Sequence, residues 1–184
     1  MQQTSAHLSP PLPAQVDVLV IGSGAAGLAA AITAASRGLR VLVAEKAPQF
    51  GGTTAYSGGW LWVPHNPAVR ADGFEEPEDA PRLYLRAVLG NQYDDRKIDS
   101  YLRAAPRMAA FFDGQTAVKF LPGMSVPDFH GDLPGAVKGG RSMVAAPYDG
   151  RALGPLLPRL RRPIPETTLC GMGIAAGADL YHFL

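Results

Sequence analysis

The most constraining feature of this sequence is the spacing of three glycines, Gly22, Gly24 and Gly27, directly after an apolar run. Residues 16–21 read VDVLVI and predict a strand, and the alanine-rich residues 25–37 predict a helix. A glycine turn between the two lets the backbone approach a ligand, because glycine has no Cβ and a helix N-terminus carries partial positive charge. The pattern therefore predicts a βαβ unit that binds a phosphate-containing ligand.

The second strand of that unit is predicted at residues 41–44, an apolar run that stops on Glu45. A carboxylate at the end of this strand accepts hydrogen bonds from the ribose diol of a dinucleotide and disfavours a 2′-phosphate. NADP is therefore not expected. With strand, glycine turn, helix, strand and acid in order, the pattern indicates a dinucleotide site rather than an incidental glycine-rich loop.

A second glycine-rich stretch, GGTTAYSGG at residues 51–59, distinguishes between the dinucleotides. Its paired glycines let the backbone double back, and the hydroxyls of Thr53 and Thr54 are placed to reach a pyrophosphate from its second side. Residues 57–59 offer nearly bare backbone on which a flat ring can lie. An NAD-dependent dehydrogenase has no evident use for this stretch, whereas an extended flavin does. FAD is the favoured ligand, and an NAD-dependent dehydrogenase is the alternative.

Together the two stretches resemble the FAD-binding domain of the fumarate reductase and succinate dehydrogenase flavoprotein superfamily. Residues 51–66, GGTTAYSGGWLWVPHN, are similar to its 3-ketosteroid Δ1-dehydrogenase branch, which residues 122–154 also resemble. The resemblance implies an α/β, Rossmann-type FAD-binding domain of a GR2-like flavoprotein, truncated before its substrate-capping domain is complete. It implies an FAD-dependent oxidoreductase that transfers hydride between flavin N5 and a carbon next to a carbonyl. Such an enzyme dehydrogenates a ketosteroid-like substrate or reduces an activated alkene.

The resemblance also implies a set of FAD contacts on the two glycine-rich stretches. These are Gly22, Ser23, Gly24, Ala25, Ala26 and Gly27 around the pyrophosphate, Glu45 and Lys46 around the adenosine ribose, Gly52, Thr53 and Thr54 along the pyrophosphate and ribityl chain, and Ser57, Gly58 and Gly59 beside the isoalloxazine. Succinate dehydrogenases hold their flavin covalently through a histidine at the position of Gly52, so non-covalent FAD is expected here.

No catalytic residue is assigned from the sequence. Ketosteroid dehydrogenases are expected to use a tyrosine from the region that residues 122–141 resemble. This chain has no tyrosine between Val118 and Pro147, and Phe129, which cannot exchange a proton, stands after the Pro-Asp step. The other catalytic groups of the family are expected beyond residue 184, so a truncated, non-catalytic flavin-binding fragment is a further alternative.

Composition narrows the remaining possibilities. The 184 residues, 47% of them apolar, suit one FAD-binding domain over residues 16–184, with a Pro- and Gly-rich segment at 122–158, after a disordered tail at 1–15. The net charge of +1 gives no reason to expect nucleic acid, and no apolar stretch has the ~20 residues of a membrane span. The single Cys170 allows no internal disulfide, which favours the cytoplasm. The expected partner is a small-molecule substrate, and the electron acceptor is left open.

The sequence pattern of residues 80–121 predicts mainly helices. One is expected at residues 80–89, and a second begins after Asp94 or Asp95 and is followed by a turn at Asp113-Gly114 and a strand at 117–121. The second helix carries one apolar stripe at three- and four-residue steps: Ile98, Tyr101, Leu102, Ala105, Met108, Ala109 and Phe112.

Separate hypotheses concern several histidine, aromatic and arginine residues. The histidines His65, His130 and His182 have no second ligand at metal spacing, so no metal site is expected. Trp60 and Trp62 either line the flavin pocket or fill the core. Tyr148 is expected to be structural, and Arg159, Arg161 and Arg162 are expected to form a solvated basic cluster.

Overall fold

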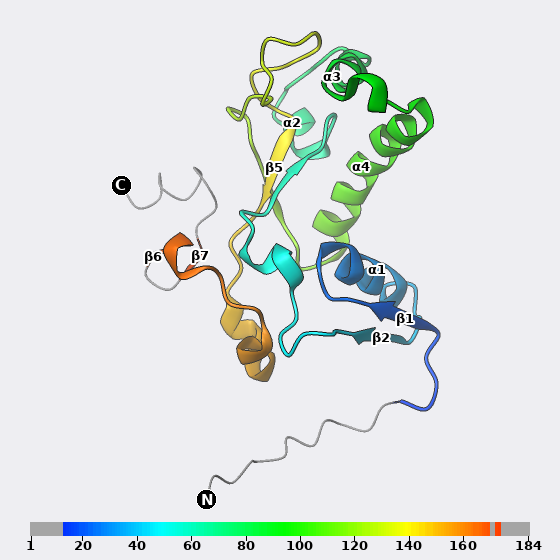
Figure 1. Cartoon of the computed structure of the whole chain (residues 1–184), viewed down its shortest axis with the longest axis vertical. Helices are drawn as coiled ribbons and strands as arrows, with labels where there is room; N and C mark the ends of the chain where they lie inside the picture. Colours follow the sequence, from blue (N-terminus) through cyan, green and yellow to red (C-terminus); the bar gives the residue numbers. More distant parts are fainter. Residues whose placement is uncertain (1–12, 170–171, 174–184) are drawn as a thin grey trace, which may run out of the picture. The chain divides into compact units, whose positions relative to one another are not determined.

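The computed structural model describes residues 13–169 and 172–173, which group into two compact units (Figure 1). Unit 1 comprises residues 13–56 and 153–163, and unit 2 comprises residues 57–152 together with the described residues from 164 on. Most of the predicted N-terminal tail, Cys170, His182 and the end of the chain lie outside the described residues.

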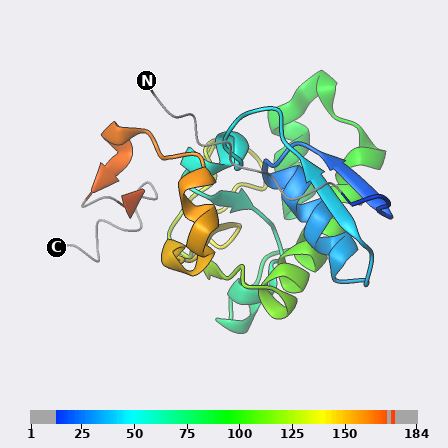
Figure 2. The ribbon, with the colours of Figure 1, turned by 90° about the horizontal axis from the view of Figure 1, so that it is seen from below.

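Unit 1 contains the predicted strand, glycine turn, helix and second strand. Strand β1 (Val18–Ile21) is followed by helix α1 (Ala25–Ala35) and strand β2 (Val41–Ala44). The two strands pair in parallel, with Val18 opposite Val41, and α1 packs against the pair (Figure 2). A 3₁₀ turn, η1 (Gly52–Tyr56), follows. These elements confirm the α/β prediction for this part of the chain.

Unit 2 is built on a three-stranded antiparallel sheet with the strand order β3-β5-β4. Its strands are β3 (Trp60–Trp62), β4 (Phe120–Pro122) and β5 (Ser142–Ala145), and its helices are α2 (Pro67–Ala71), α3 (Ala80–Leu89) and α4 (Asp95–Gln115). The shorter elements are the 3₁₀ turns η2 (Gly90–Gln92), η3 (Gly150–Arg159, which continues into unit 1) and η4 (Pro165–Thr167), and the strand pair β6 (Thr168–Leu169) and β7 (Met172–Gly173).

Helix α4 supplies much of the core of unit 2. Its N-cap is Asp94, whose side chain accepts a hydrogen bond from the main-chain N of Lys97 at 3.1 Å. Buried positions of the predicted stripe pack with other elements in a cluster of Val63, Ala105, Ala109 and Met143. Tyr101 departs from the stripe, since it is 40% exposed and its ring stacks on Trp62, with the centroids 6.3 Å apart.

The turn predicted at Asp113-Gly114 is wrong, because α4 continues through both residues to Gln115. The helix ends at Thr116, whose main-chain N and hydroxyl both donate to the carbonyl of Phe112. The Asp113 carboxylate instead accepts a hydrogen bond from the main-chain N of Phe120 at 3.0 Å. Phe120 is the first residue of β4, which starts three residues later than the predicted strand.

Candidate functional site

Each of the three glycines of the first loop is required for a different structural reason. Gly22 has φ +93°, a conformation that glycine adopts readily. A Cβ on Gly27 would overlap the carbonyl oxygen of Gly22 and lie 2.9 Å from its carbonyl carbon, so Gly27 permits the close approach of α1 to β1. A Cβ on Gly24 would meet no atom within 4 Å. Gly24 therefore leaves open space directly before the N-terminus of α1, where a phosphate is favoured.

The second glycine-rich stretch lies directly against the first. Gly52 has φ +58°, and a Cβ there would lie 3.0 Å from the Cα of Gly24. The hydroxyl of Thr54 accepts a hydrogen bond from the main-chain N of Ala25 at 3.1 Å. Two backbone segments without Cβ atoms thus face each other at a helix N-terminus, an arrangement that suits a pyrophosphate group.

Ser23 joins the two loops to the end of β2. Its side chain is almost fully buried, and its main-chain N and its hydroxyl both donate to Oε2 of Glu45. The same hydroxyl accepts a hydrogen bond from the main-chain N of Gly51 at 3.0 Å. The resemblance implied a pyrophosphate contact at Ser23, and the structure adds that its hydroxyl bonds to both Glu45 and Gly51.

The carboxylate of Glu45 is held by its own chain. Oε1 accepts a hydrogen bond from the main-chain N of Ala47 at 2.8 Å, and Oε2 accepts the two bonds from Ser23. The bond from Ala47, followed by those from Ser23, lowers the pKa of Glu45 from 4.5 to about 2. The group is therefore ionised at neutral pH and shapes the first loop, while its neighbour Lys46 and Thr53 of the second stretch are exposed.

The last three predicted cofactor residues, Ser57, Gly58 and Gly59, open unit 2. The main-chain N of Gly59 donates to the Ser57 hydroxyl at 3.3 Å. The carbonyl of Gly59 accepts a hydrogen bond from the main-chain N of Ala145 at 3.2 Å, which fixes it to the end of β5.

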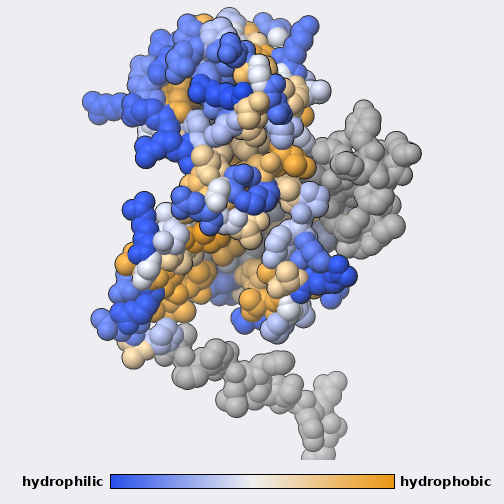
Figure 3. All heavy atoms as spheres, turned by 180° about the vertical axis from the view of Figure 1, so that it is seen from behind, coloured by the Kyte–Doolittle hydropathy of each residue, from blue (hydrophilic) through white to orange (hydrophobic). Residues whose placement is uncertain are grey.

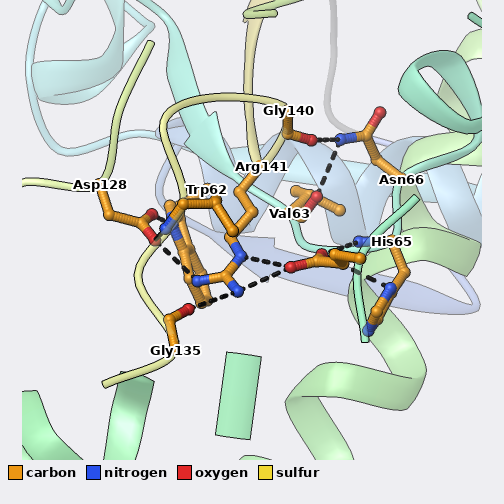
Figure 4. A network of polar contacts seen from close by, with 10 residues as sticks. Trp62, Val63, His65, Asn66, Asp128, Gly135, Gly140 and Arg141 are labelled. Carbon is orange, nitrogen blue, oxygen red and sulfur yellow. Dashed lines mark hydrogen bonds and ion pairs between the residues drawn. The ribbon is translucent and has the colours of Figure 1, made fainter. Parts of the chain in front are cut away.

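Unit 2 contains a group of charged residues that the sequence analysis missed, the buried charge cluster of Arg141, Glu76 and Asp128 (Figure 4). Their side chains are only 1%, 2% and 1% exposed, respectively. Arg141 donates from Nε and Nη2 to Glu76 at 2.7 and 2.6 Å and from Nη1 to Asp128 at 2.7 Å. Its Nη2 also donates to the carbonyl of Gly135 at 2.8 Å, so the guanidinium is held on every side.

Aromatic residues close this cluster. The indole Nε1 of Trp62 donates to Oδ1 of Asp128 at 2.7 Å, and the guanidinium of Arg141 lies 5.6 Å from the ring centroids of Trp62 and Tyr84. Trp62 thus packs against the buried charge cluster of unit 2. The main-chain N of His65 donates to the other Glu76 oxygen at 3.3 Å, which extends the network to a residue with φ +56°.

The two aromatic candidates of the later sequence, Phe129 and Tyr148, are largely exposed. Phe129 is 99% exposed, and Tyr148 is 58% exposed beside an apolar pocket of about 420 Å³. No group of three or more His, Cys, Asp or Glu side chains in the described part of the chain is placed to hold a metal ion. None of the helices within the described ranges is long and apolar enough to cross a membrane.

Comparisons with known proteins agree on the cofactor. Residues 17–183 match the family model of the FAD binding domain. The chain is 43% identical over 151 residues to a 3-oxosteroid 1-dehydrogenase of Mycolicibacterium smegmatis, covering 81% of this chain and 26% of that protein. It is 40% identical over 167 residues to the 4-oxocyclohex-2-ene-1-carboxylate 5-dehydrogenase of Sinomonas cyclohexanicum, covering 91% of this chain and 28% of that protein.

A solved structure supports the same relationship. The 3-ketosteroid Δ1-dehydrogenase of Sterolibacterium denitrificans, determined in complex with 1,4-androstadiene-3,17-dione, superposes with a TM-score of 0.79 at 34% identity. The match covers 87% of this chain and 29% of that one. The chain therefore spans about a quarter of the length of the relatives it matches.

Proposed function

Because this chain belongs to the family of the FAD binding domain, we propose that it forms the FAD-holding part of a dehydrogenase that acts on a cyclic ketone. The observation that carries the proposal is the close approach of the two glycine-rich stretches at the N-terminus of α1. A Cβ built on Gly52 would lie only 3.0 Å from the Cα of Gly24. This surface has the backbone donors, the open space and the positive helix end that a pyrophosphate requires.

The proposed contacts follow the sequence prediction. Residues 22–27 and 52–54 hold the pyrophosphate and the start of the ribityl chain, and Glu45 and Lys46 lie at the adenosine ribose. Ser57, Gly58 and Gly59 are candidates for the isoalloxazine on the resemblance alone. The fold is that of a GR2-like flavoprotein, and FAD is bound without a covalent link, because glycine stands at the position of the covalent histidine.

The reaction class follows from the relatives. Both have names that describe dehydrogenation of a cyclic compound bearing an oxo group. FAD, when bound, supplies a hydride acceptor at N5. The chain binds and orients it, while the proton lost from the neighbouring substrate carbon must pass to a group other than the exposed Phe129. With one cysteine in the sequence, we also infer a reducing, cytoplasmic setting.

Absorption spectroscopy tests the proposal directly. The purified chain is mixed with FAD, desalted, and examined for a retained flavin band, with NADH as a competitor. A retained band that is released on denaturation supports non-covalent FAD. A folded protein that keeps no flavin but binds NADH would instead support an NAD-dependent dehydrogenase.

The Gly24→Val substitution tests whether the space beside Gly24 binds the pyrophosphate. Gly24 has the extended angles φ −74° and ψ −176°, and its Cβ direction is open, so valine fits the fold but fills the space proposed for the pyrophosphate. We expect the variant to remain folded and to lose FAD. Gly114→Val, at an equally open glycine in α4, is the matched control and is expected to keep FAD. Tight FAD binding by Gly24→Val would show that the cradle is misassigned.

A further inference from the structure

A segment more than a hundred residues away in sequence lies beside the second glycine-rich stretch. Within unit 1, the main-chain N of Phe50 donates to the carbonyl of Arg159, and the main-chain N of Arg161 donates to the carbonyl of Phe50, each at 2.9 Å. Phe50 and Leu160 thereby form a parallel bridge. Phe50 directly precedes the glycine pair, so the bridge fixes the entry into η1.

Leu160 also packs at the start of η1. A Cβ on Gly51 would lie 3.2 Å from Cδ1 of Leu160, which shows how closely this side chain covers the glycine. The side-chain amide of Gln49 donates to the carbonyl of Leu160 at 3.5 Å. The segment therefore contacts three consecutive residues before the turn.

Arg161 reaches the other end of the turn with its side chain. Its guanidinium carbon lies 5.8 Å from the ring centroid of Tyr56, and Nη1 donates to the Tyr56 hydroxyl at 3.4 Å. Tyr56 is the last residue of η1. Arg161 is thus tied by its main chain to the beginning of the turn and by its side chain to the end.

The charge of Arg161 is not used in an ion pair within residues 13–169 and 172–173. By contrast, Arg40, Arg82, Arg86, Arg141 and Arg151 all pair with carboxylates. The planar guanidinium is half-buried against Tyr56, a placement that suits contact with a ring better than a solvated surface role.

We propose that Arg161 is a positioning residue of the FAD site, which holds η1 in the conformation that receives the flavin half of the cofactor. This inference rests on the proposed function, since it assumes that residues 52–54 contact FAD. It replaces the expectation of a solvated cluster for Arg161, while the exposed Arg162 keeps that expectation.

FAD titration of Arg161→Gln, with the dissociation constant read from flavin fluorescence, tests the inference. Loss of a cation–π contact and a hydrogen bond is expected to weaken FAD by about tenfold. Arg162→Gln removes the same charge from the next residue and is expected to leave the constant unchanged. Equal constants for the two variants would overturn the proposal.

Adenosine separates positioning from general destabilisation, because it lacks both the flavin half of FAD and the pyrophosphate that residues 52–54 are proposed to hold. Arg161→Gln is expected to weaken adenosine by no more than about twofold, since the turn serves the pyrophosphate, ribityl and flavin side. An equal loss for adenosine and FAD would indicate a general structural defect and overturn the positioning role.

The contact with Tyr56 is tested by a double-mutant cycle. Tyr56→Leu removes the ring and should weaken FAD as much as Arg161→Gln, and the double variant should be no weaker than either. Fully additive losses would show that Arg161 does not act through Tyr56. If circular dichroism shows that Arg161→Gln does not fold, the FAD dissociation constants of Tyr56→Leu and Arg162→Gln are compared instead, and equal constants would overturn the proposal.

A wild-type chain that binds no FAD would refute the proposed function, whereas wild-type binding with an unaffected Arg161→Gln refutes this inference alone.

Discussion

The two units of this chain are stabilised in different ways. Unit 1 depends on glycines, main-chain hydrogen bonds and the side-chain bonds of Ser23 and Glu45, and it leaves Leu19 and Ile21 of β1 56% and 76% exposed. Unit 2 encloses the buried charge cluster and the apolar cluster around Met143. Apolar residues that reach the molecular surface are visible in Figure 3. Unit 1, which we propose to hold FAD, therefore depends less on buried side chains than unit 2, whose buried charged and apolar groups stabilise its fold.

The largest expected effect is loss of stability in unit 2 from Arg141→Leu. The change leaves Glu76 and Asp128 buried without their cation, which is expected to cost about 3–5 kcal/mol of unfolding free energy. Urea denaturation followed by circular dichroism measures it. Arg107→Leu, on the exposed side of α4, is the control and should change stability by less than about 0.5 kcal/mol. A similarly small loss for Arg141→Leu would contradict a stabilising role of the buried charge cluster in unit 2.

Gly27→Ala and Gly24→Ala distinguish two kinds of glycine within unit 1. The methyl group at Gly27 would overlap the carbonyl of Gly22, so β1 and α1 must separate, at a cost of about 3 kcal/mol. The methyl group at Gly24 meets no protein atom, so stability should change by less than about 1 kcal/mol while FAD binding weakens. Thermal unfolding and FAD titration measure the two effects. Equal destabilisation by both variants would contradict the distinction between a packing glycine and a ligand-facing one.

Trp62→Phe tests one hydrogen bond of the buried charge cluster. It removes the 2.7 Å bond to Asp128 and leaves a buried carboxylate oxygen without that donor, at an expected cost of about 1–2 kcal/mol. Trp60→Phe, on the same strand, makes a similar change in ring size and is expected to cost less. Urea midpoints compare the two. Equal losses would assign the effect to packing rather than to the hydrogen bond.

The smallest expected effect is the pH dependence contributed by Glu45 in unit 1. Its pKa is lowered in the folded chain from 4.5 to about 2, so the ionised carboxylate stabilises the fold fully above pH 4.5. This stabilisation is lost as the pH falls from about 4.5 toward 2. Thermal unfolding of wild type and Glu45→Gln at several pH values measures the difference between them. That difference should shrink with acidification, and a constant difference would exclude this role of the carboxylate.

The helices and strands that depend on neighbouring residues could be predicted from the sequence. The bounds of α3 were predicted correctly, and those of β1, α1 and β2 closely, because apolar periodicity and glycine punctuation act within a few residues. The turn predicted at Asp113-Gly114 failed, since a helix continued by tertiary packing overrides weak turn signals. The proposed roles of the cofactor residues stay predictions until FAD binding is measured.

The glycine loops follow from the sequence alone, because tolerance of a positive φ and the absence of a Cβ are properties of single residues. The partners of the long polar side chains depend instead on the folded arrangement of distant segments. Arg141 meets Glu76 across 65 residues, and Arg161 meets Tyr56 across 105, and neither separation follows any helical or strand period. Such pairings depend on which groups become buried together, since a buried charge requires a partner wherever the chain brings one.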